Sequence, residues 1–268
     1  SAVELEKNYV RDGIFMVISG CIMLGILSIF AVIFVVPFVE EWPYRLGFTL
    51  DHFTSVLQDP NLLSVFTNSL FVAFCVAVVG VLMSYGAALI TARSTLNEKL
   101  KSVIEAIALV INTIPGMVLG IAFLLTFSGT SLQGTFLILI VCDVVHYFST
   151  PYLMVKNSLS KMNASWETTA MLMGDSWIKT IIRVVTPNAF STLLEVFSYY
   201  FVNAMVTISA VIFIAGAYTM VITTKIKELQ YYNRFNEVFV LSLFILVVNI
   251  IAKYLFQWLA KRTSRDSK

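Results

Sequence analysis

Long apolar runs alternate with short polar segments along the whole chain. Because a helix of about 20 apolar residues crosses the hydrocarbon core of a bilayer, each long run is a candidate membrane span. The first run, "IFMVISGCIMLGILSIFAVIFVVPF", contains no charged residue. The predicted spans cover residues 14–38, 68–91, 103–127, 135–155, 192–222 and 238–260. The pattern therefore predicts an all-α membrane protein with six transmembrane helices.

The polar segments at the ends and between the spans define the predicted organisation. We expect an N-terminal segment, 1–13, a transmembrane domain, 14–260, and a basic tail, 261–268. The transmembrane domain includes a long polar loop, 156–191. Because the chain starts with Ser1, we interpret its beginning as a native or processed terminus, a boundary chosen for expression, or the start of the second half of a longer polypeptide.

Composition supports the membrane class. Hydrophobic residues make up 58% of the chain and charged residues 13%, whereas soluble domains carry roughly a quarter charged residues. The net charge of +2 gives no reason to expect a nucleic-acid partner. The three cysteines lie singly in apolar runs, so their spacing indicates neither a disulfide framework nor a metal site.

The placement of basic residues predicts the orientation in the membrane. Lys and Arg accumulate in cytoplasmic loops. If the N-terminus is cytoplasmic, the predicted outer loops hold only four of the 18 basic residues: Arg45, Lys225, Lys227 and Arg234. This bias predicts cytoplasmic N- and C-termini, and it places the loop 156–191 in the cytoplasm.

That loop contains an amphipathic stretch, "ETTAMLMGDSWIKTIIRVVTP". Apolar residues recur at steps of three and four, which predicts one helical face. The members of this face are Trp166, Ala170, Met173, Trp177, Ile181 and Val184. Gly174 predicts a turn between two short helices or a close approach by another backbone, and Pro187 predicts the end of the second helix. Periodicity alone leaves two interpretations open: a helix on the lipid headgroups or an element that docks on a soluble partner.

The stretch resembles the EAA loop of ATP-binding-cassette (ABC) importer permeases, whose pattern is E-A-A-x3-G-x9-I-x-L-P. Gly174 and Pro187 keep the Gly-to-Pro spacing, and "VVTP" stands at the I-x-L-P position. The triplet falls on "TTA", in which only the alanine matches, and an acidic residue directly precedes it. The residues assigned to ATPase coupling by this resemblance are Glu167, Thr168, Thr169, Ala170, Gly174, Trp177 and Pro187.

Three further segments resemble the permease subgroup for iron(III), polyamines, thiamine and 2-aminoethylphosphonate. They are "NTIPGMVLGIAFLLTF" (112–127), "FVNAMVTISAVIFI" (201–214) and "FTLDHFTSVLQDPNLLSVFTNSL" (48–70). In the first of these, Pro115 predicts a kink, and the small-xxx-small pattern of "GMVLG" predicts close helix packing.

The resemblance implies a bacterial inner-membrane permease subunit whose EAA loop is a cytoplasmic coupling helix between helices 4 and 5. It implies two ABC ATPase subunits, a second permease half, identical or homologous, and an external solute-binding protein that meets the loops 39–67 and 223–237. ATP and Mg would bind to the ATPase, since this chain carries no Gly-x4-Gly-Lys-Ser/Thr phosphate loop and no catalytic set. The chain itself would then need no cofactor and would not be an enzyme. The favoured substrate is iron(III) or a phosphonate such as 2-aminoethylphosphonate, and a polyamine or thiamine is less favoured.

Polar residues inside the predicted spans are candidates for the translocation path. Charged groups at bilayer depth usually face a bundle interior or water. Asp143 and His146 share a helical face, as a packing pair or as a gate. The candidate path or gate residues are Asp143, His146, Asn203, Thr207 and Asn112. Two alternatives stay open: an ion- or proton-coupled secondary transporter that uses Asp143 and His146 as a relay, and a membrane-embedded enzyme.

Overall fold

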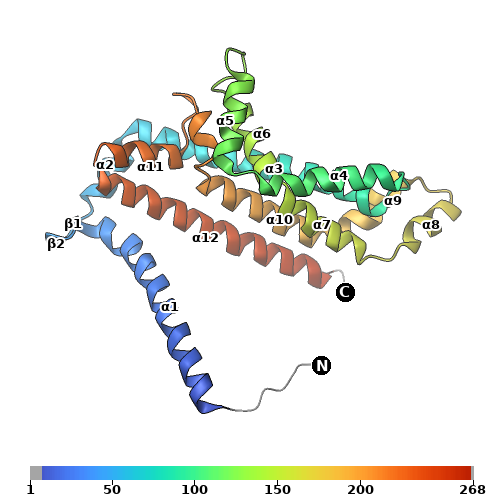
Figure 1. The fold of residues 1–268 in the computed structure, drawn as a ribbon, viewed down its shortest axis with the longest axis horizontal. Coiled ribbons are helices and arrows are strands. Elements are labelled where there is room, and N and C mark those ends of the chain that lie inside the picture. The colour runs from blue at the N-terminus through green and yellow to red at the C-terminus, as the bar shows by residue number, and fades with distance from the viewer. Residues whose placement is uncertain (1–7, 267–268) are drawn as a thin grey trace.

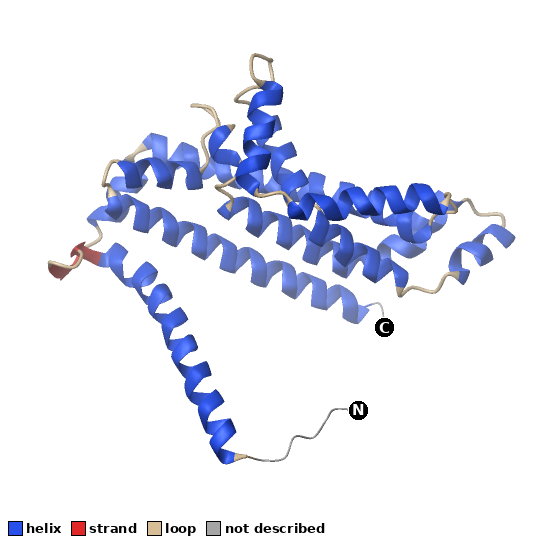
Figure 2. Cartoon of the chain, viewed as in Figure 1, coloured by secondary structure: helices blue, strands red, loops and turns tan. Residues whose placement is uncertain are grey.

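The computed structural model describes residues 8–266 and is almost entirely helical (Figure 2). A two-stranded antiparallel sheet of β1 (Val39–Glu41) and β2 (Arg45–Phe48) follows the first helix. The α-helices are α1 (Tyr9–Val35), α2 (Asp51–Gln58), α3 (Pro60–Arg93), α4 (Glu98–Val110), α5 (Gly116–Phe127), α6 (Phe136–His146), α7 (Ser149–Ser160), α8 (Ser165–Leu172), α9 (Trp177–Thr180), α10 (Thr186–Val206), α11 (Ile222–Tyr231) and α12 (Phe235–Asp266). The short turns η1 (Val36–Phe38), η2 (Ile111–Thr113) and η4 (Val211–Phe213) are 3-10 helical, and η3 (Ile181–Val185) is π-helical.

The helices form one elongated bundle (Figure 1). Helix α10 packs on α3 and α12, while α7 packs on both α3 and α10. The hairpin, α2 and α11 lie at one end of the bundle, and α8 lies at the other. Helices α5 and α6 rise together from its side, and α1 diverges from it with no buried residue. The bundle therefore has two distinct ends for contacts outside the membrane.

The described residues contain four helices that are long and apolar enough to cross a membrane, and up to six spans if each of two bent helix pairs counts as one. The helix around 98–127 bends by 108° between Thr113 and Gly116, at the predicted proline kink. The helix around 136–160 bends by 56° after His146. Broken membrane helices, which the sequence did not make evident, are thus a main feature of this fold.

The predicted fifth span, 192–222, is wrong in its bounds. Helix α10 ends at Val206, and residues 207–221 are irregular apart from η4. Parts of this segment are buried, including Thr207 and Ala210, so the apolar run reflects packing against α5 instead of a membrane-spanning helix. The predicted polar loops 223–237 and 39–67 are also corrected, because the first is largely α11 and the second contains the hairpin, α2 and the start of α3.

Two clusters of buried side chains hold the bundle together. One lies among α3, α6, α7 and α10 and includes the fully buried Tyr152 and Tyr200. The other joins α2, α3, α11 and α12 around Leu62 and Leu241. Helix α3 contributes to both clusters, so it connects the two ends of the bundle.

The predicted terminal segments lie partly outside the described residues. Residues 1–7 of the segment 1–13 and residues 267–268 of the tail 261–268 are not described. Residues 9–13 belong to α1, and residues 261–266 continue α12. Within the described range, both segments thus extend the adjacent helices.

Candidate functional site

The segment α8–α9, at the end of the bundle away from the hairpin, has the predicted form of two short helices joined at a glycine (Figure 1). Gly174 has a φ of +83°. Its N–H donates to the Met171 carbonyl at 3.0 Å, and the Asp175 N–H donates to the Ala170 carbonyl at 2.9 Å. These two bonds form a Schellman motif, which needs a residue in the left-handed region. The turn therefore explains why glycine stands at this position.

The prediction that Pro187 ends the second helix is wrong. The helical run continues from Trp177 to Val206, and Pro187 lies in the first turn of α10. Directly before it, the π-helical turn η3 widens the helix, and the Thr186 hydroxyl donates to the Ile181 carbonyl at 2.9 Å. A π-bulge absorbs a residue that cannot donate to the helical ladder. Helix α9 is thus continuous with α10, while α8 is separated from it by the turn at Gly174.

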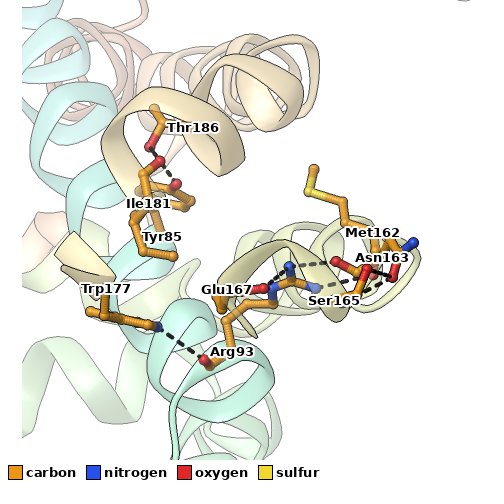
Figure 3. A network of polar contacts seen from close by, with 9 residues as sticks. All are labelled: Tyr85, Arg93, Met162, Asn163, Ser165, Glu167, Trp177, Ile181 and Thr186. Carbon is orange, nitrogen blue, oxygen red and sulfur yellow. Dashed lines mark hydrogen bonds and ion pairs between the residues drawn. The ribbon is translucent and has the colours of Figure 1, made fainter. Parts of the chain in front are cut away.

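Arg93, the last residue of α3, forms hydrogen bonds with the α8–α9 segment and with the residues just before it (Figure 3). Its Nε donates to Glu167 Oε1 at 2.6 Å and its Nη2 to Oε2 at 2.7 Å. The guanidinium also donates to the carbonyls of Met162 and Asn163, each at 3.0 Å. The Arg93 carbonyl accepts from Trp177 Nε1 at 3.2 Å. One arginine therefore binds the residues before α8, α8 itself and α9.

The outward surface of this segment differs from the predicted apolar face. Trp166 and Trp177 pack against the chain's own core, because the turn at Gly174 breaks the single helical periodicity on which the prediction rested. In α9, Ile178 is 64% exposed, but the most exposed apolar residues lie together at the end of α8: Met171, Leu172 and Met173, with 67%, 85% and 80% of their surface exposed. We call these three residues the apolar tip. Thr168 and Thr169 are exposed beside it, and Ala170 and Glu167 are half-buried.

A second cluster lies where three membrane helices end or bend. A Cβ added to Gly116, at the start of α5, would lie 2.3 Å from Ser209 Oγ and 3.1 Å from the His146 ring. The Thr207 hydroxyl lies 2.7 Å from the Tyr147 hydroxyl, at the bend between α6 and α7. Close packing of this kind confirms the role predicted for the small residues of "GMVLG". The bends of the two broken spans and the end of α10 therefore meet at one place, and we call these residues the helix-break cluster: Gly116, His146, Tyr147, Thr207 and Ser209.

The structure does not pair Asp143 with His146, so the predicted packing pair is wrong. Asp143 is 1% exposed, and its Oδ1 accepts no hydrogen bond from the described residues. The His146 ring instead packs on the Tyr147 ring, with centroids 4.6 Å apart. The two side chains share a helix but have separate environments. Asn112 lies in the exposed turn η2.

A polar groove runs along α10, α7 and α12. Its lining includes Glu195, Tyr199 and Asn203, which are spaced by four residues and hence lie along one side of α10. Lys253 and Gln257 of α12 complete it, and its volume is about 510 Å³. No group of three or more His, Cys, Asp or Glu side chains within residues 8–266 is placed to hold a metal ion. The groove can therefore contact a solute through one acid, one base, hydroxyls and amides.

A comparison with known proteins identifies the family. Residues 84–265 match the model of the binding-protein-dependent transport system inner membrane component. The chain belongs to this family. It is thus an inner-membrane, multi-pass permease component of a binding-protein-dependent ABC transport system. The matched range contains the α8–α9 segment, the helix-break cluster and the polar groove.

Relatives at the sequence level are distant. The permease is 24% identical over 256 residues to the ferric transport system permease protein FbpB of Actinobacillus pleuropneumoniae, covering 90% of this chain and 36% of that protein. A putative ferric transport system permease of Haemophilus influenzae is 28% identical over 75% of this chain and 32% of its own length. The molybdate/tungstate transport system permease WtpB of Pyrococcus furiosus is 24% identical, with 81% and 85% covered. The chain spans about a third of the length of the two ferric permeases.

Solved structures share the fold of the permease. A bacterial ABC transporter that imports the polysaccharide alginate matches with a TM-score of 0.75 at 15% identity, covering 95% of this chain and 97% of that chain. The MetNI methionine ABC transporter matches with a TM-score of 0.59 at 16% identity, covering 79% and 100%. The fold of this chain, with its broken helices, is therefore that of an ABC permease.

Sequence reasoning missed two parts of this site. Arg93 carries no local signal of its role, because its partner Glu167 is 74 residues away. The apolar tip is visible in the sequence as "MLM" next to the glycine, but its exposure depends on the turn. In contrast, the position of the α8–α9 segment follows from the Gly-to-Pro spacing alone.

Proposed function

We propose that this chain is the permease subunit of an ATP-driven importer. It crosses the bacterial inner membrane six times with both termini in the cytoplasm, and it works with a second permease half, two ATPase subunits that bind ATP and Mg, and an external solute-binding protein. The observation that carries the proposal is the protruding α8–α9 segment within the range matched by the family model. This membership replaces the alternatives of an ion-coupled transporter and a membrane enzyme.

The apolar tip is the proposed contact with the ATPase. Three large apolar side chains at the end of a short helix are unusual for a surface that faces only water. Flexible Met side chains adapt to irregular apolar pockets and are common at binding surfaces. Glu167 makes a bidentate bond within the chain, so the docking energy is assigned to the tip instead of the acid. The role of α8 is therefore to present Leu172 and its neighbours to a pocket.

We expect the double substitution Leu172→Glu, Met173→Glu to prevent the ATPase from co-purifying with the permease. Two charges would have to enter an apolar pocket unpaired, which is strongly unfavourable. The measurement is the ratio of ATPase to permease after affinity purification in detergent, and we expect a loss of at least tenfold. Tyr218→Glu is the matched control, because Tyr218 is 93% exposed and lies beside α11 at the opposite end of the bundle. An unchanged ratio for the double variant would contradict docking through the tip.

The polar groove is the proposed inner part of the translocation path. Glu195 and Lys253 are exposed on α10 and α12, within helices that otherwise have the composition of membrane spans. Ionised side chains at such depth face water or protein rather than lipid. We therefore propose that the second permease half covers this face and that the groove, with Tyr199 and Asn203, contacts the solute. Thr207, one helical turn beyond Asn203 and farther from α9, belongs with His146 to the helix-break cluster.

We expect Glu195→Gln and Lys253→Gln each to lower uptake at least fivefold while leaving the ATPase bound. Both substitutions remove a charge from the proposed path but leave the tip and the α8–α9 turn unchanged. The measurement is uptake into proteoliposomes that contain the purified transporter, compared with Lys227→Gln, a control on an exposed lysine of α11. Normal uptake by both groove variants would place the path elsewhere.

The proposed substrate is iron(III) or a phosphonate-type solute. Two relatives carry ferric transport in their names, and the groove offers one carboxylate and one ammonium group. The solute-binding protein of the same system decides between the two classes. Its dissociation constants for iron(III) and for 2-aminoethylphosphonate, measured by calorimetry, test this part of the proposal directly.

A further inference from the structure

Helix α3 is fixed at its last residue and in its third turn to segments that lie toward opposite ends of the bundle. At the inner end, Arg93 makes four hydrogen bonds through its guanidinium and one through its carbonyl, all to residues 162–177. The Arg93 side chain is 4% exposed and that of Glu167 14%. A bidentate Arg–carboxylate pair of this kind fixes orientation as well as distance. Movement of α8 therefore has to move the end of α3 or break this pair (Figure 3).

At the outer end, α3 holds the segment that leads into α11. Asn68 Nδ2 lies 3.2 Å from the carbonyl oxygens of both Tyr218 and Met220. The N–H of Ile222 donates to Ser69 Oγ at 2.6 Å. This segment lies at the end of the bundle away from α8 (Figure 1).

Between these two points, α3 is a single uninterrupted helix. Its only proline is Pro60, in the first turn, and from Asn68 to Arg93 it runs for about 37 Å at about 1.5 Å per residue. In the middle, Gly80 lies directly under the Tyr200 ring, and the Ser84 and Tyr200 hydroxyls lie 2.8 Å apart. The helix pairs α4–α5 and α6–α7 are bent by 108° and 56°, whereas the runs Trp177–Val206 and Phe235–Thr263 are unbroken like α3. Helix α3 is thus a straight connection between the ATPase side and the outer side, and among the described helices it is the one that binds α8 through side-chain hydrogen bonds.

We propose that α3 transmits the movement of the α8–α9 segment to residues 218–222, with Arg93 and Glu167 as positioning residues at the inner end and Asn68 and Ser69 at the outer end. The inference rests on the proposed function, because it assumes that an ATPase moves α8. It also gives Glu167 a role different from a direct contact with the ATPase. The Glu167 carboxylate is bound by Arg93 within the permease, and it keeps α8 and α3 together while the ATPase moves α8.

The experiment follows the outer segment while the nucleotide state changes, and it needs no transported solute. A cysteine is placed by Tyr218→Cys, which keeps the backbone carbonyl that Asn68 binds, and the exposed Cys21 is replaced by Ser. The permease is purified with its ATPase subunits. Labelling of Cys at 218 by a membrane-impermeant maleimide is then timed without nucleotide and with Mg-ATP plus vanadate. We expect the trapped state to change the labelling rate at least threefold.

In this background, we expect Glu167→Gln and the double variant Asn68→Ala, Ser69→Ala to remove the nucleotide response while the ATPase stays bound. Asp175→Asn is the matched control, since Asp175 forms a half-exposed ion pair with Lys179 in the same segment, and it should keep the full response. Arg93→Gln is expected to behave like Glu167→Gln. If Arg93→Gln does not give a folded protein in a thermal melt, Glu167→Gln provides the test. This substitution removes the charge and the bidentate pair, but its amide oxygen still accepts one hydrogen bond from the guanidinium, so we expect the variant to fold.

Each remaining outcome decides a different point. If no ATPase co-purifies with the parental permease, the proposed function fails. If the ATPase binds but the parental Cys at 218 gives no nucleotide response, the inference is overturned. It is also overturned if Glu167→Gln keeps the response, or if this substitution releases the ATPase, because Glu167 would then act at the subunit contact.

Discussion

Gly120→Ala is expected to destabilise the permease by about 3 kcal/mol, the upper part of the range for overpacked sites. The added Cβ would lie 2.3 Å from the carbonyl oxygen of Ala210, and a backbone atom cannot rotate away as a side chain can. Ala210 lies in the buried segment after α10, which is held by the hydrogen bond from Thr223 Oγ1 to the Thr207 carbonyl at 2.5 Å. The clash would therefore separate α5 from the helix-break cluster.

Gly86→Ala is the matched control for this prediction. Gly86 also lies inside a helix, but a Cβ added there meets no atom within 4 Å. Alanine in a helix interior is more stable than glycine by up to about 1 kcal/mol, so we expect Gly86→Ala to leave the melting temperature unchanged or higher. The measurement is thermal unfolding of both variants in detergent. Equal melting temperatures for the two would contradict the close approach of α5 to residues 209–210.

Much of the fold is predictable from the sequence where the cause is local. The apolar runs locate the membrane helices, since their length matches the bilayer. Pro115 marks the sharpest bend because proline removes a backbone donor. Gly174 marks the turn between α8 and α9 because the left-handed region favours glycine. In each case, one residue type and its neighbours determine the backbone.

The parts that sequence reasoning missed depend on contacts between distant segments. Residues 207–221 read as membrane helix because a buried irregular segment is as apolar as a span. The bend between α6 and α7 is an exception with a local cause, because Pro151 in the first turn of α7 cannot donate to the carbonyl of Tyr147, four residues earlier, a signal that sequence reasoning overlooked. The inward position of Trp177 depends on Arg93, 84 residues earlier in the chain. Hydropathy and periodicity carry no information about such pairs.

Substitution of Gly174 is expected to have the second large effect, and it tests the backbone conformation of the turn independently of side-chain packing. A Cβ at this position would meet no atom within 4 Å, so any cost of substitution comes from the φ of +83° alone. An L-residue in the left-handed region costs about 1–2 kcal/mol, and a β-branched side chain is especially unfavourable there, whereas Asn tolerates it. Gly174→Val and Gly174→Asn are therefore a matched pair that differ in conformational preference.

We expect Gly174→Val to lower uptake by roughly 5–30-fold, the population change that corresponds to 1–2 kcal/mol, and Gly174→Asn to stay within about twofold of the parental protein. The reason is geometric. The Schellman bonds from Gly174 and Asp175 set the direction of α8, and a different turn would point the apolar tip away from the ATPase while Arg93 still holds Glu167. Uptake into proteoliposomes and the ATPase-to-permease ratio are measured together. Equal loss in both variants would mean that the side-chain volume matters here, which would place a partner surface directly against Gly174 rather than at the tip.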